Sequence, residues 1–368
     1  MKQLCTLLWC FLCFAANAQR IEITNDSDLS RTETVIEIPW SSIISQNPNL
    51  TVGDFKVMDA DNEVPFQLEY KGLTKVQNLL VQLSIAENEK RVLTVATGKP
   101  AQFAAKTFAR YVPERLDDLA WENDKIAFRT YGEALEGTKG DAYGFDVWGK
   151  RTSDLIINRR YKHGDYHNDR GDGLDYYHVG LTLGAGNIAP IINDKIYYSG
   201  NYHRWKILDN GPLRTTFTLD YDEWLVDGKK VTSEKIISID AGSQMYKVEA
   251  FYHFQDELMP LVIGIVKRPE AGTITLDETH GLMSYWEPEH GKDGITGVGV
   301  FVPSKISKMT VTEEQLLTHV KTSKNTPFIY YAGAAWNKAG SITNAEAWRK
   351  YLTYFRMEKL TPLQITIQ

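Results

Sequence analysis

The stretch FTLDYDEWLVDGKKVTSEKIISID, residues 217–240, contains two strand patterns separated by one turn signal. Apolar residues largely alternate with polar residues in FTLDYDEWLV and again in KIISID, as in strands with one buried face. Asp227-Gly228 lies between them, and this dipeptide favours a tight hairpin loop. The stretch therefore predicts an antiparallel hairpin.

Further strand patterns follow this hairpin at a spacing near ten residues, which fits an antiparallel sandwich. They occupy residues 245–254, 261–266, 273–278, 297–302, 308–312 and 327–336. One helix is expected, over residues 344–357, with Asn344 as its N-cap. The fold class predicted from the residues is all-β.

The first hundred residues show shorter strands broken by turn clusters. The strand patterns are residues 20–24, 33–40, 54–59, 79–85 and 91–97, and they end near Gly98-Lys99-Pro100. We expect a small β-rich N-terminal domain of residues 19–100. Residues 101–368 form the second, catalytic domain in this interpretation.

Residues 1–18 have the features of a cleavable secretory signal peptide: Lys2, an apolar core and Ala16-Asn17-Ala18. The three cysteines all lie in this segment, so the mature chain would have no disulfide, thiol nucleophile or thiolate metal site. The formal charge of −6 and the lack of a lysine-rich tract argue against a nucleic-acid partner. No later apolar run is long enough for membrane insertion, and a periplasmic location is expected.

The segment RRYKHGDYHNDRGDGLDYYHVGLTLGAG, residues 159–186, is rich in histidine, aspartate and tyrosine. His163 and His167 have the spacing of a helical metal-binding pair, but Gly164 interrupts a helix and the context favours strands. We expect a hairpin that presents histidines and tyrosines at one end of a sheet. A metal bound by these histidines, or by the nearby aspartates, stays open, although the EF-hand pattern is not met. No cofactor is expected to be required.

Two kinds of sugar chemistry were compared for this segment. A glycoside hydrolase needs two opposed carboxylates, and no pair stands out among Glu122, Asp124, Asp172 and Asp175. β-Elimination on a uronate needs a cation to neutralise the carboxylate, a base for the C5 proton and an acid for O4. Histidine, tyrosine and arginine supply these roles. Taken singly, each histidine is more often an ordinary polar residue, and the concentration of four favours a functional segment.

The residues expected to act are assigned by their chemistry. His167 and His178 are the predicted acid/base pair, assisted by Tyr166 or Tyr177. The predicted carboxylate-binding residues are Arg170, Arg204 and Asn123, with Lys150 as a further charge-neutralising residue. Predicted sugar contacts are Glu122, Trp148, His163, His203 and Trp205.

Several motifs resemble a carbohydrate-active family of Bacteroidota that was long described only as a domain of unknown function. The motifs are VPERLDDLAWENDKIAFRTYG, DVWGKR, YHNDRGDGLDYYHVGLTLGAG, NGPLRTTF and YYAGAAW. The resemblance implies a galactose-mutarotase-like β-supersandwich. It also implies an oligosaccharide dehydratase of the kind used in ulvan breakdown, which removes water from a non-reducing-end uronate to give a 4,5-unsaturated sugar.

Three alternatives remain at this level. A polysaccharide lyase performs the same elimination with a sugar rather than hydrogen on O4. A non-catalytic carbohydrate-binding protein needs only exposed aromatic residues. A mutarotase-like epimerase would use a histidine and a carboxylate without forming a double bond.

Overall fold

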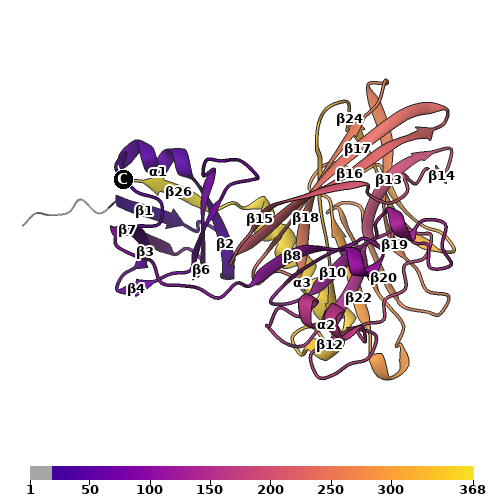
Figure 1. Ribbon diagram of the computed structural model, residues 1–368, viewed down its shortest axis with the longest axis horizontal. Helices are drawn as coiled ribbons and strands as arrows, with labels where there is room; N and C mark the ends of the chain where they lie inside the picture. Colours follow the sequence, from indigo (N-terminus) through magenta and orange to yellow (C-terminus); the bar gives the residue numbers. More distant parts are fainter. Residues whose placement is uncertain (1–18) are drawn as a thin grey trace, which may run out of the picture.

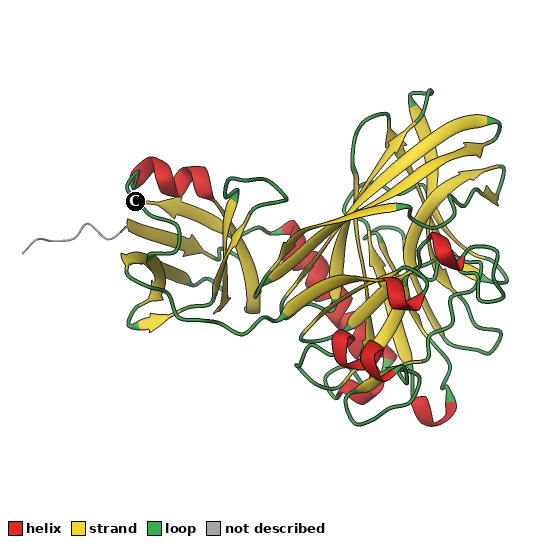
Figure 2. Ribbon diagram, viewed as in Figure 1, coloured by secondary structure: helices red, strands yellow, loops and turns green. Residues whose placement is uncertain are grey.

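The computed structural model describes residues 19–368, and the predicted signal peptide lies outside them. Strands dominate the described chain, with three α-helices among residues 19–368 (Figure 2). A smaller domain and a larger domain lie side by side along the long axis (Figure 1). The predicted all-β class is confirmed.

The smaller domain consists of two antiparallel sheets packed face to face. One sheet has the order β26 (Gln364–Ile367), β1 (Gln19–Thr24), β7 (Lys90–Thr97), β3 (Phe55–Asp59) and β4 (Asn62–Glu63). The other has the order β2 (Arg31–Pro39), β6 (Asn78–Ile85) and β5 (Phe66–Glu69), and α1 (Trp40–Gln46) follows β2. Alternate apolar residues such as Ile21, Ile23 and Val57 form one core between the sheets.

The C-terminal strand of the chain belongs to this smaller domain. β26 pairs antiparallel with β1, with Ile367 opposite Ile21 and Ile365 opposite Ile23. Figure 1 shows the yellow C-terminal strand beside the indigo N-terminal strand. The smaller domain therefore also contains the C-terminal strand β26. The predicted boundary at residue 100 is incomplete, because it assigns this strand to the larger domain.

The larger domain is built on an eight-stranded antiparallel sheet. Its order is β15 (Arg204–Asn210), β16 (Arg214–Val226), β17 (Lys229–Asp240), β18 (Met245–His253), β25 (Phe328–Trp336), β22 (Thr296–Phe301), β21 (Leu282–Trp286) and β20 (Thr273–Asp277). Asp227 and Gly228 form the two-residue loop between β16 and β17, with φ of 50° and 78°. These left-handed values are those of the primed turns that suit hairpins, so the predicted hairpin is confirmed.

Two five-stranded sheets cover the inner face of the large sheet. One has the order β12 (Gly173–Asp175), β11 (Asp146–Lys150), β10 (Ala127–Thr130), β9 (Asp118–Asn123) and β8 (Thr107–Val112). The other has the order β14 (Lys195–Ile196), β13 (Ala185–Ile192), β19 (Leu258–Val266), β24 (Gln315–Ser323) and β23 (Lys308–Val311). A single apolar core fills the space between these layers. The domain is a large antiparallel β-sandwich.

Buried polar side chains of this core form hydrogen bonds to β13 where its pairing with β19 is irregular. The pairing of β13 with β19 shifts register between Ala185 and Ile188. Three buried tyrosines of the large sheet donate hydrogen bonds to β13 carbonyls in this region: Tyr246, Tyr252 and Tyr330. Lys235, from β17, donates to Asn187 Oδ1 at 2.7 Å. Each phenol can therefore be buried without losing its hydrogen bond.

The helix α3 (Ala345–Leu360) packs on the outer face of the large sheet. Asn344 caps it, because its side chain accepts a hydrogen bond from the Ala347 N–H at 2.9 Å. The buried residues Trp348, Leu352 and Phe355 form one face against β21 and β22. The predicted late helix and its cap are confirmed.

Candidate active site

The histidine-rich segment begins with a helix rather than a strand. The helix α2 covers Ile157–His163, and Gly164 ends it with φ 67°, a value that glycine adopts without steric cost. The predicted hairpin is therefore wrong in its first arm, because Tyr161 packs as part of a helical face on the first five-stranded sheet. His163 lies at the helix end and His167 beyond it, so they do not share a helix face.

A buried charged group lies beneath α2. Arg129 of β10 contacts three carboxylates, those of Asp146 at 2.5 Å, Asp175 at 2.8 Å and Asp118 at 3.4 Å. Burial raises the pKa of Asp118 to about 6, although Arg129 lies beside it. The group ties β9, β10, β11 and β12 together on the outer face of their sheet. The Asp175 carboxylate therefore binds Arg129 directly, and it also lies 3.8 Å from His167 Nδ1.

Tyr166 and Trp148 are packing residues in this layer. Their rings stack at 5.1 Å, both side chains are buried, and Arg115 Nε donates to the Tyr166 hydroxyl at 2.8 Å. His167 is exposed, and its Nδ1 lies 2.8 Å from the Asp175 carbonyl oxygen. Of Tyr166, Trp148 and His167, only His167 presents its side chain to solvent.

Glu122, Asn123 and Lys150 are buried and satisfied inside the protein. Lys150 Nζ donates to Glu122 Oε2 at 2.7 Å and to the Asn123 carbonyl at 2.6 Å. Glu122 also accepts the backbone N–H groups of Ile156 and Ile157 at the start of α2. Two predictions are therefore corrected, because all four side chains are buried: Glu122 and Trp148 are not sugar contacts, and Asn123 and Lys150 are not available to a substrate carboxylate. Glu122 instead holds the start of α2 on the sheet.

A second set of predicted residues lies at the start of β15. Arg204 and His203 both contact the Asp222 carboxylate, at 2.5 Å and 2.9 Å. Trp205 stacks on Tyr111 at 4.8 Å and is partly exposed. No hydrogen bond, ion pair or ring contact joins these three side chains to residues 159–186 in the described part of the chain. The exposed residues His163 and Arg170 also remain apart, Arg170 being paired with Asp165 at 2.6 Å.

Tyr176 and Tyr177, which follow β12, point in opposite directions. Tyr177 is buried, and its hydroxyl donates to the Gly184 carbonyl at 3.3 Å, so it is not available to a substrate. Tyr176 is half-buried, and the Thr296 hydroxyl donates to its oxygen at 2.7 Å. Burial raises the pKa of Tyr176, and nearby Glu287 adds to the effect. Of the two adjacent tyrosines, Tyr176 is therefore the one whose side chain is partly exposed.

His290 stacks on Tyr176, with ring centroids 5.3 Å apart. It precedes the 3-10 turn Gly291–Asp293, and its Nδ1 lies 3.2 Å from Asp293 Oδ2. Trp336 Nε1 donates to the Asp293 carbonyl at 2.8 Å and so holds this turn on β25. In the neutral imidazole tautomer whose Nδ1–H donates to Asp293, Nε2 is the ring nitrogen that can accept a proton.

Arg268 and Glu287 complete this group. Arg268 Nε donates to Glu287 Oε1 at 2.6 Å, and its Nη1 donates to the His178 carbonyl at 2.6 Å. The guanidinium also lies over the Tyr177 ring, 4.7 Å from its centroid. Burial raises the pKa of Glu287 to about 7 despite the neighbouring Arg268 charge. The pair combines a fixed cation with a carboxyl group that titrates near neutrality.

We call Tyr176, Arg268, Glu287, His290, Asp293 and Thr296 the tyrosine–histidine site. The loops after β12, β19 and β21 and the start of β22 bring these residues to one end of the domain. His178 is exposed beside it, so of the predicted acid/base residues it is the one whose backbone contacts the site. The arrangement supplies an acid, a base and a cation.

Sequence patterns had not identified Arg268, Glu287 or His290. WEPEH, residues 286–290, places a carboxylate and a histidine directly after a strand, and KR at 267–268 follows the apolar run LVIGIV. Charged residues at strand ends are the signal that could have identified them.

Two properties concern metal and membrane binding. Within residues 19–368, no group of three or more His, Cys, Asp or Glu side chains is arranged to hold a metal ion. In the same range, no helix has the length and apolar composition needed to cross a membrane.

The fold and site define an all-β protein whose larger domain is an antiparallel sandwich. The chain belongs to the family described as "Domain of unknown function (DUF4861)", which it matches over residues 23–365. It is 31% identical over 376 residues to "Uncharacterized protein P7" of Formosa agariphila, an alignment that covers 95% of this chain and 93% of that protein. The shared family therefore spans both domains.

A solved structure described as a protein in the glycosyl hydrolase family 38 from Enterococcus faecalis has a similar fold. The TM-score is 0.55 at 10% identity, and the match covers 96% of this chain and 48% of that one. The chain thus spans about half the length of the solved structure that it matches. At this identity the likeness concerns the fold alone.

Proposed function

We propose that the protein is a carbohydrate-active elimination enzyme that works at the tyrosine–histidine site. The preferred reaction is removal of water from a non-reducing-end uronate of an oligosaccharide, giving a 4,5-unsaturated uronate. The observation that carries the proposal is that Tyr176, Arg268 and His290 converge at one end of the sandwich. A sugar substrate also agrees with the fold shared with a glycosyl hydrolase family 38 protein.

Arg268 is the residue proposed to neutralise the uronate carboxylate. A carboxylate makes the neighbouring C5 proton hard to remove unless its charge is compensated. Arg268 is held by the His178 carbonyl and by Glu287, so its position is fixed before substrate binds. When Glu287 is protonated, the charge of Arg268 is free to pair with the substrate.

His290 is proposed as the base and Tyr176 as the acid. His290 Nε2 takes the C5 proton, the C5–H electron pair forms the C4–C5 double bond, and the C4–O4 bond breaks. Tyr176 donates its proton to O4, which departs as water when O4 carries hydrogen. The raised pKa of Tyr176 keeps the phenol protonated until this step. Solvent then carries the proton from His290 back to Tyr176.

The same groups would perform a lyase reaction if O4 carried a sugar. The choice of dehydration, of an ulvan-type substrate and of a periplasmic setting follows from the family resemblance and the leader-like sequence. These parts of the proposal are independent of the acid/base assignment.

The proposal is tested by incubating the protein with glucuronate-terminated oligosaccharides and following ultraviolet absorbance and product mass. We expect a conjugated alkene together with the loss of one water. An alkene with chain cleavage would identify a lyase. Binding or anomer interconversion without any alkene would contradict elimination and favour a binding protein or an epimerase.

A further inference from the structure

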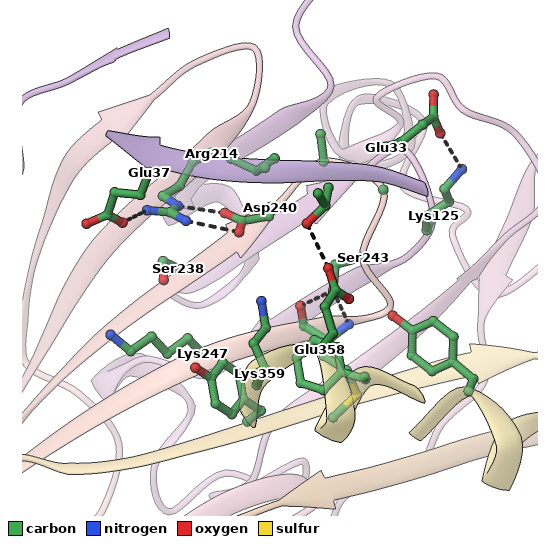
Figure 3. Close-up of a pocket in the computed structure, with 18 of the residues that line it drawn as sticks. Glu33, Glu37, Lys125, Arg214, Ser238, Asp240, Ser243, Lys247, Glu358 and Lys359 are labelled. Atoms are coloured by element: carbon green, nitrogen blue, oxygen red, sulfur yellow. Dashed lines mark hydrogen bonds and ion pairs between the residues drawn. The ribbon is translucent and has the colours of Figure 1, made fainter. Parts of the chain in front are cut away.

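A cavity of about 910 Å³ lies between the two domains, away from the tyrosine–histidine site. Its floor is the outer face of the large sheet at β16, β17, β18 and β25, and its wall is α3. Residues of β2 and the end of β5 in the smaller domain cover it. Figure 3 shows charged and hydroxyl side chains from these elements around the opening. Ligand pockets often lie at domain interfaces and measure roughly 300–1,000 Å³.

The floor carries a row of polar side chains in register across four strands. Thr216 pairs with Ser238, Ser238 with Lys247, and Lys247 with Tyr331. Paired residues in an antiparallel sheet lie on the same face, so all four side chains line the cavity. The Thr216 hydroxyl oxygen is buried and has no hydrogen-bond partner in the part of the chain that the structure describes.

An unpartnered buried hydroxyl is costly to a folded protein unless something outside the chain satisfies it. Thr216 is 5% exposed and lies beside Ser238 on the next strand. In Figure 3 Ser238 lies between Arg214 and Lys247. Two neighbouring hydroxyls beside a lysine are suited to a ligand that carries both hydroxyl groups and a negative charge.

The carboxylates around the cavity already have partners. Arg214 contacts Glu37 at 2.6 Å, Glu69 at 3.1 Å and Asp240 at 2.6 Å, which also fixes the smaller domain on the larger one. The remaining contacts are Glu33 with Lys125, Glu249 with Lys247, and Glu358 with the Thr34 hydroxyl. The cavity's negative charge is therefore largely compensated within the protein.

Two lysines of α3 are left without such partners. Lys350 and Lys359 line the cavity, and neither makes an ion pair within 4.0 Å in residues 19–368. Lys359 extends from α3 toward Asp240 in Figure 3, and its Nζ lies 5.1 Å from the Phe355 ring centroid. The cavity therefore has spare positive charge beside the aromatic rings of Tyr331 and Phe355.

We propose that this interdomain cavity is a second binding site, for an acidic oligosaccharide. Lys359 and Lys350 hold a carboxylate or sulfate group, Thr216 and Ser238 bind sugar hydroxyls, and the Tyr331 ring contacts an apolar sugar face. A small inorganic anion would use only the lysines and leave the hydroxyl row and most of the volume empty. The choice of an acidic saccharide rests on the proposed function, whereas the site is separate from the proposed chemistry.

The test uses the full chain carrying Tyr176→Phe, so that turnover does not consume the probe. A glucuronate-containing tetrasaccharide is titrated by calorimetry, and hydrogen–deuterium exchange locates the binding site. We expect protection of β2 and α3. The neutral, carboxyl-reduced tetrasaccharide is expected to bind about tenfold more weakly, because it cannot form the charged hydrogen bonds to the lysines. Inorganic phosphate is expected to give no protection.

Two variants and one control separate ligand binding from folding. Lys359→Ala is expected to weaken tetrasaccharide binding about tenfold. Thr216→Val removes the unpartnered hydroxyl, so it should keep or raise the Tm of the free protein while weakening binding. Lys324→Ala, an exposed lysine in the loop after β24, should change neither.

The proposal is overturned if the tetrasaccharide leaves the exchange of β2 and α3 unchanged. It is also overturned if phosphate protects these elements equally well, or if Thr216→Val and Lys359→Ala bind the tetrasaccharide like the control. These readouts do not depend on alkene formation. Failure of the elimination proposal would be seen separately, as absence of alkene with the natural protein while the Tyr176→Phe protein still shows protection.

Discussion

At the residue scale, the proposed base His290 contacts the Asp293 carboxylate. This contact orients the imidazole ring, and Nε2 is the nitrogen that it leaves for the substrate. Asp293→Asn should lower kcat about 10- to 100-fold with little change in KM, as expected when the partner of an essential histidine is lost. Steady-state kinetics on the uronate substrate measure the effects on kcat and KM separately. An Asn variant with unchanged kcat would remove Asp293 from the mechanism.

Glu287 predicts the pH dependence of the reaction. The pKa of Glu287 is about 7. As the pH rises through 7, ionised Glu287 therefore competes increasingly with the substrate carboxylate for Arg268. The rate should therefore fall above this pH. Glu287→Gln is neutral at every pH and should keep its activity on the alkaline side. A pH–rate profile in which both proteins lose activity over the same range would refute this role.

The buried Lys235 should make the free energy of unfolding depend on pH, independently of catalysis. Burial lowers its pKa from 10.5 to about 7, so between these values the unfolded chain binds a proton that the native chain does not. The native state therefore gains stability as pH rises through this window, by about 1.4 kcal/mol per pH unit.

Lys235→Met removes this dependence, while Asn187 Oδ1 still accepts from the Ile188 N–H at 2.8 Å. The variant should be more stable than the natural protein at pH 6, with an advantage that shrinks toward pH 10. Denaturant unfolding at both values measures the difference. An advantage that stays constant with pH would show that Lys235 does not titrate in this range.

The residue types of the site could be predicted from sequence, but only some of the positions. Tyrosine, histidine and arginine were expected, and His178 lies beside the site that the structure defines. Tyr177 was chosen over Tyr176 because the sequence gives no indication of which of two adjacent residues faces the core. Arg268 and His290 depend on sheet order, which brings β19 and β21 to the end of β12.

At the element scale, α2 is held by a buried ion pair beneath it. Glu122→Gln leaves the Lys150 ammonium buried without its counter-charge and weakens acceptance of the first helical N–H groups. The free energy of unfolding should fall by about 3–5 kcal/mol.

The matched control is Glu223→Gln, which breaks an exposed pair with Lys230 of the same 2.7 Å length. It should cost less than about 1 kcal/mol. Chemical denaturation of both variants provides the comparison. Equal effects of the two substitutions would contradict the structural role given to Glu122.

The elements themselves were predictable where a local signal specifies them. Asp227-Gly228 specifies the β16–β17 hairpin, and Asn344 with the apolar positions that follow specifies α3. The helix α2 was missed because it is short and begins without a side-chain cap of its own. Its first N–H groups are satisfied by Glu122, which is distant in sequence, and no local pattern reports such a contact.

At the scale of the whole molecule, both ends of the chain stabilise the smaller domain. Ile365 and Ile367 of β26 pack on its core and pair with β1. Removing residues 363–368 should destabilise this domain by about 2–3 kcal/mol through lost apolar burial. Hydrogen exchange should become faster in β1 and β7 and stay unchanged in β17. Unchanged exchange in β1 would contradict this role of β26.

The central claim is that elimination on a uronate occurs at Tyr176 and His290, and one measurement tests it most directly. The rate of alkene formation from glucuronate-terminated oligosaccharides is compared for the natural protein, His290→Ala and His167→Ala. Both variants replace an exposed histidine, so folding should be preserved in each. We expect at least a hundredfold loss in His290→Ala, the lower range for general acid–base catalysis (~100-fold), and near-normal activity in His167→Ala. Loss in His167→Ala with full activity in His290→Ala would contradict this claim.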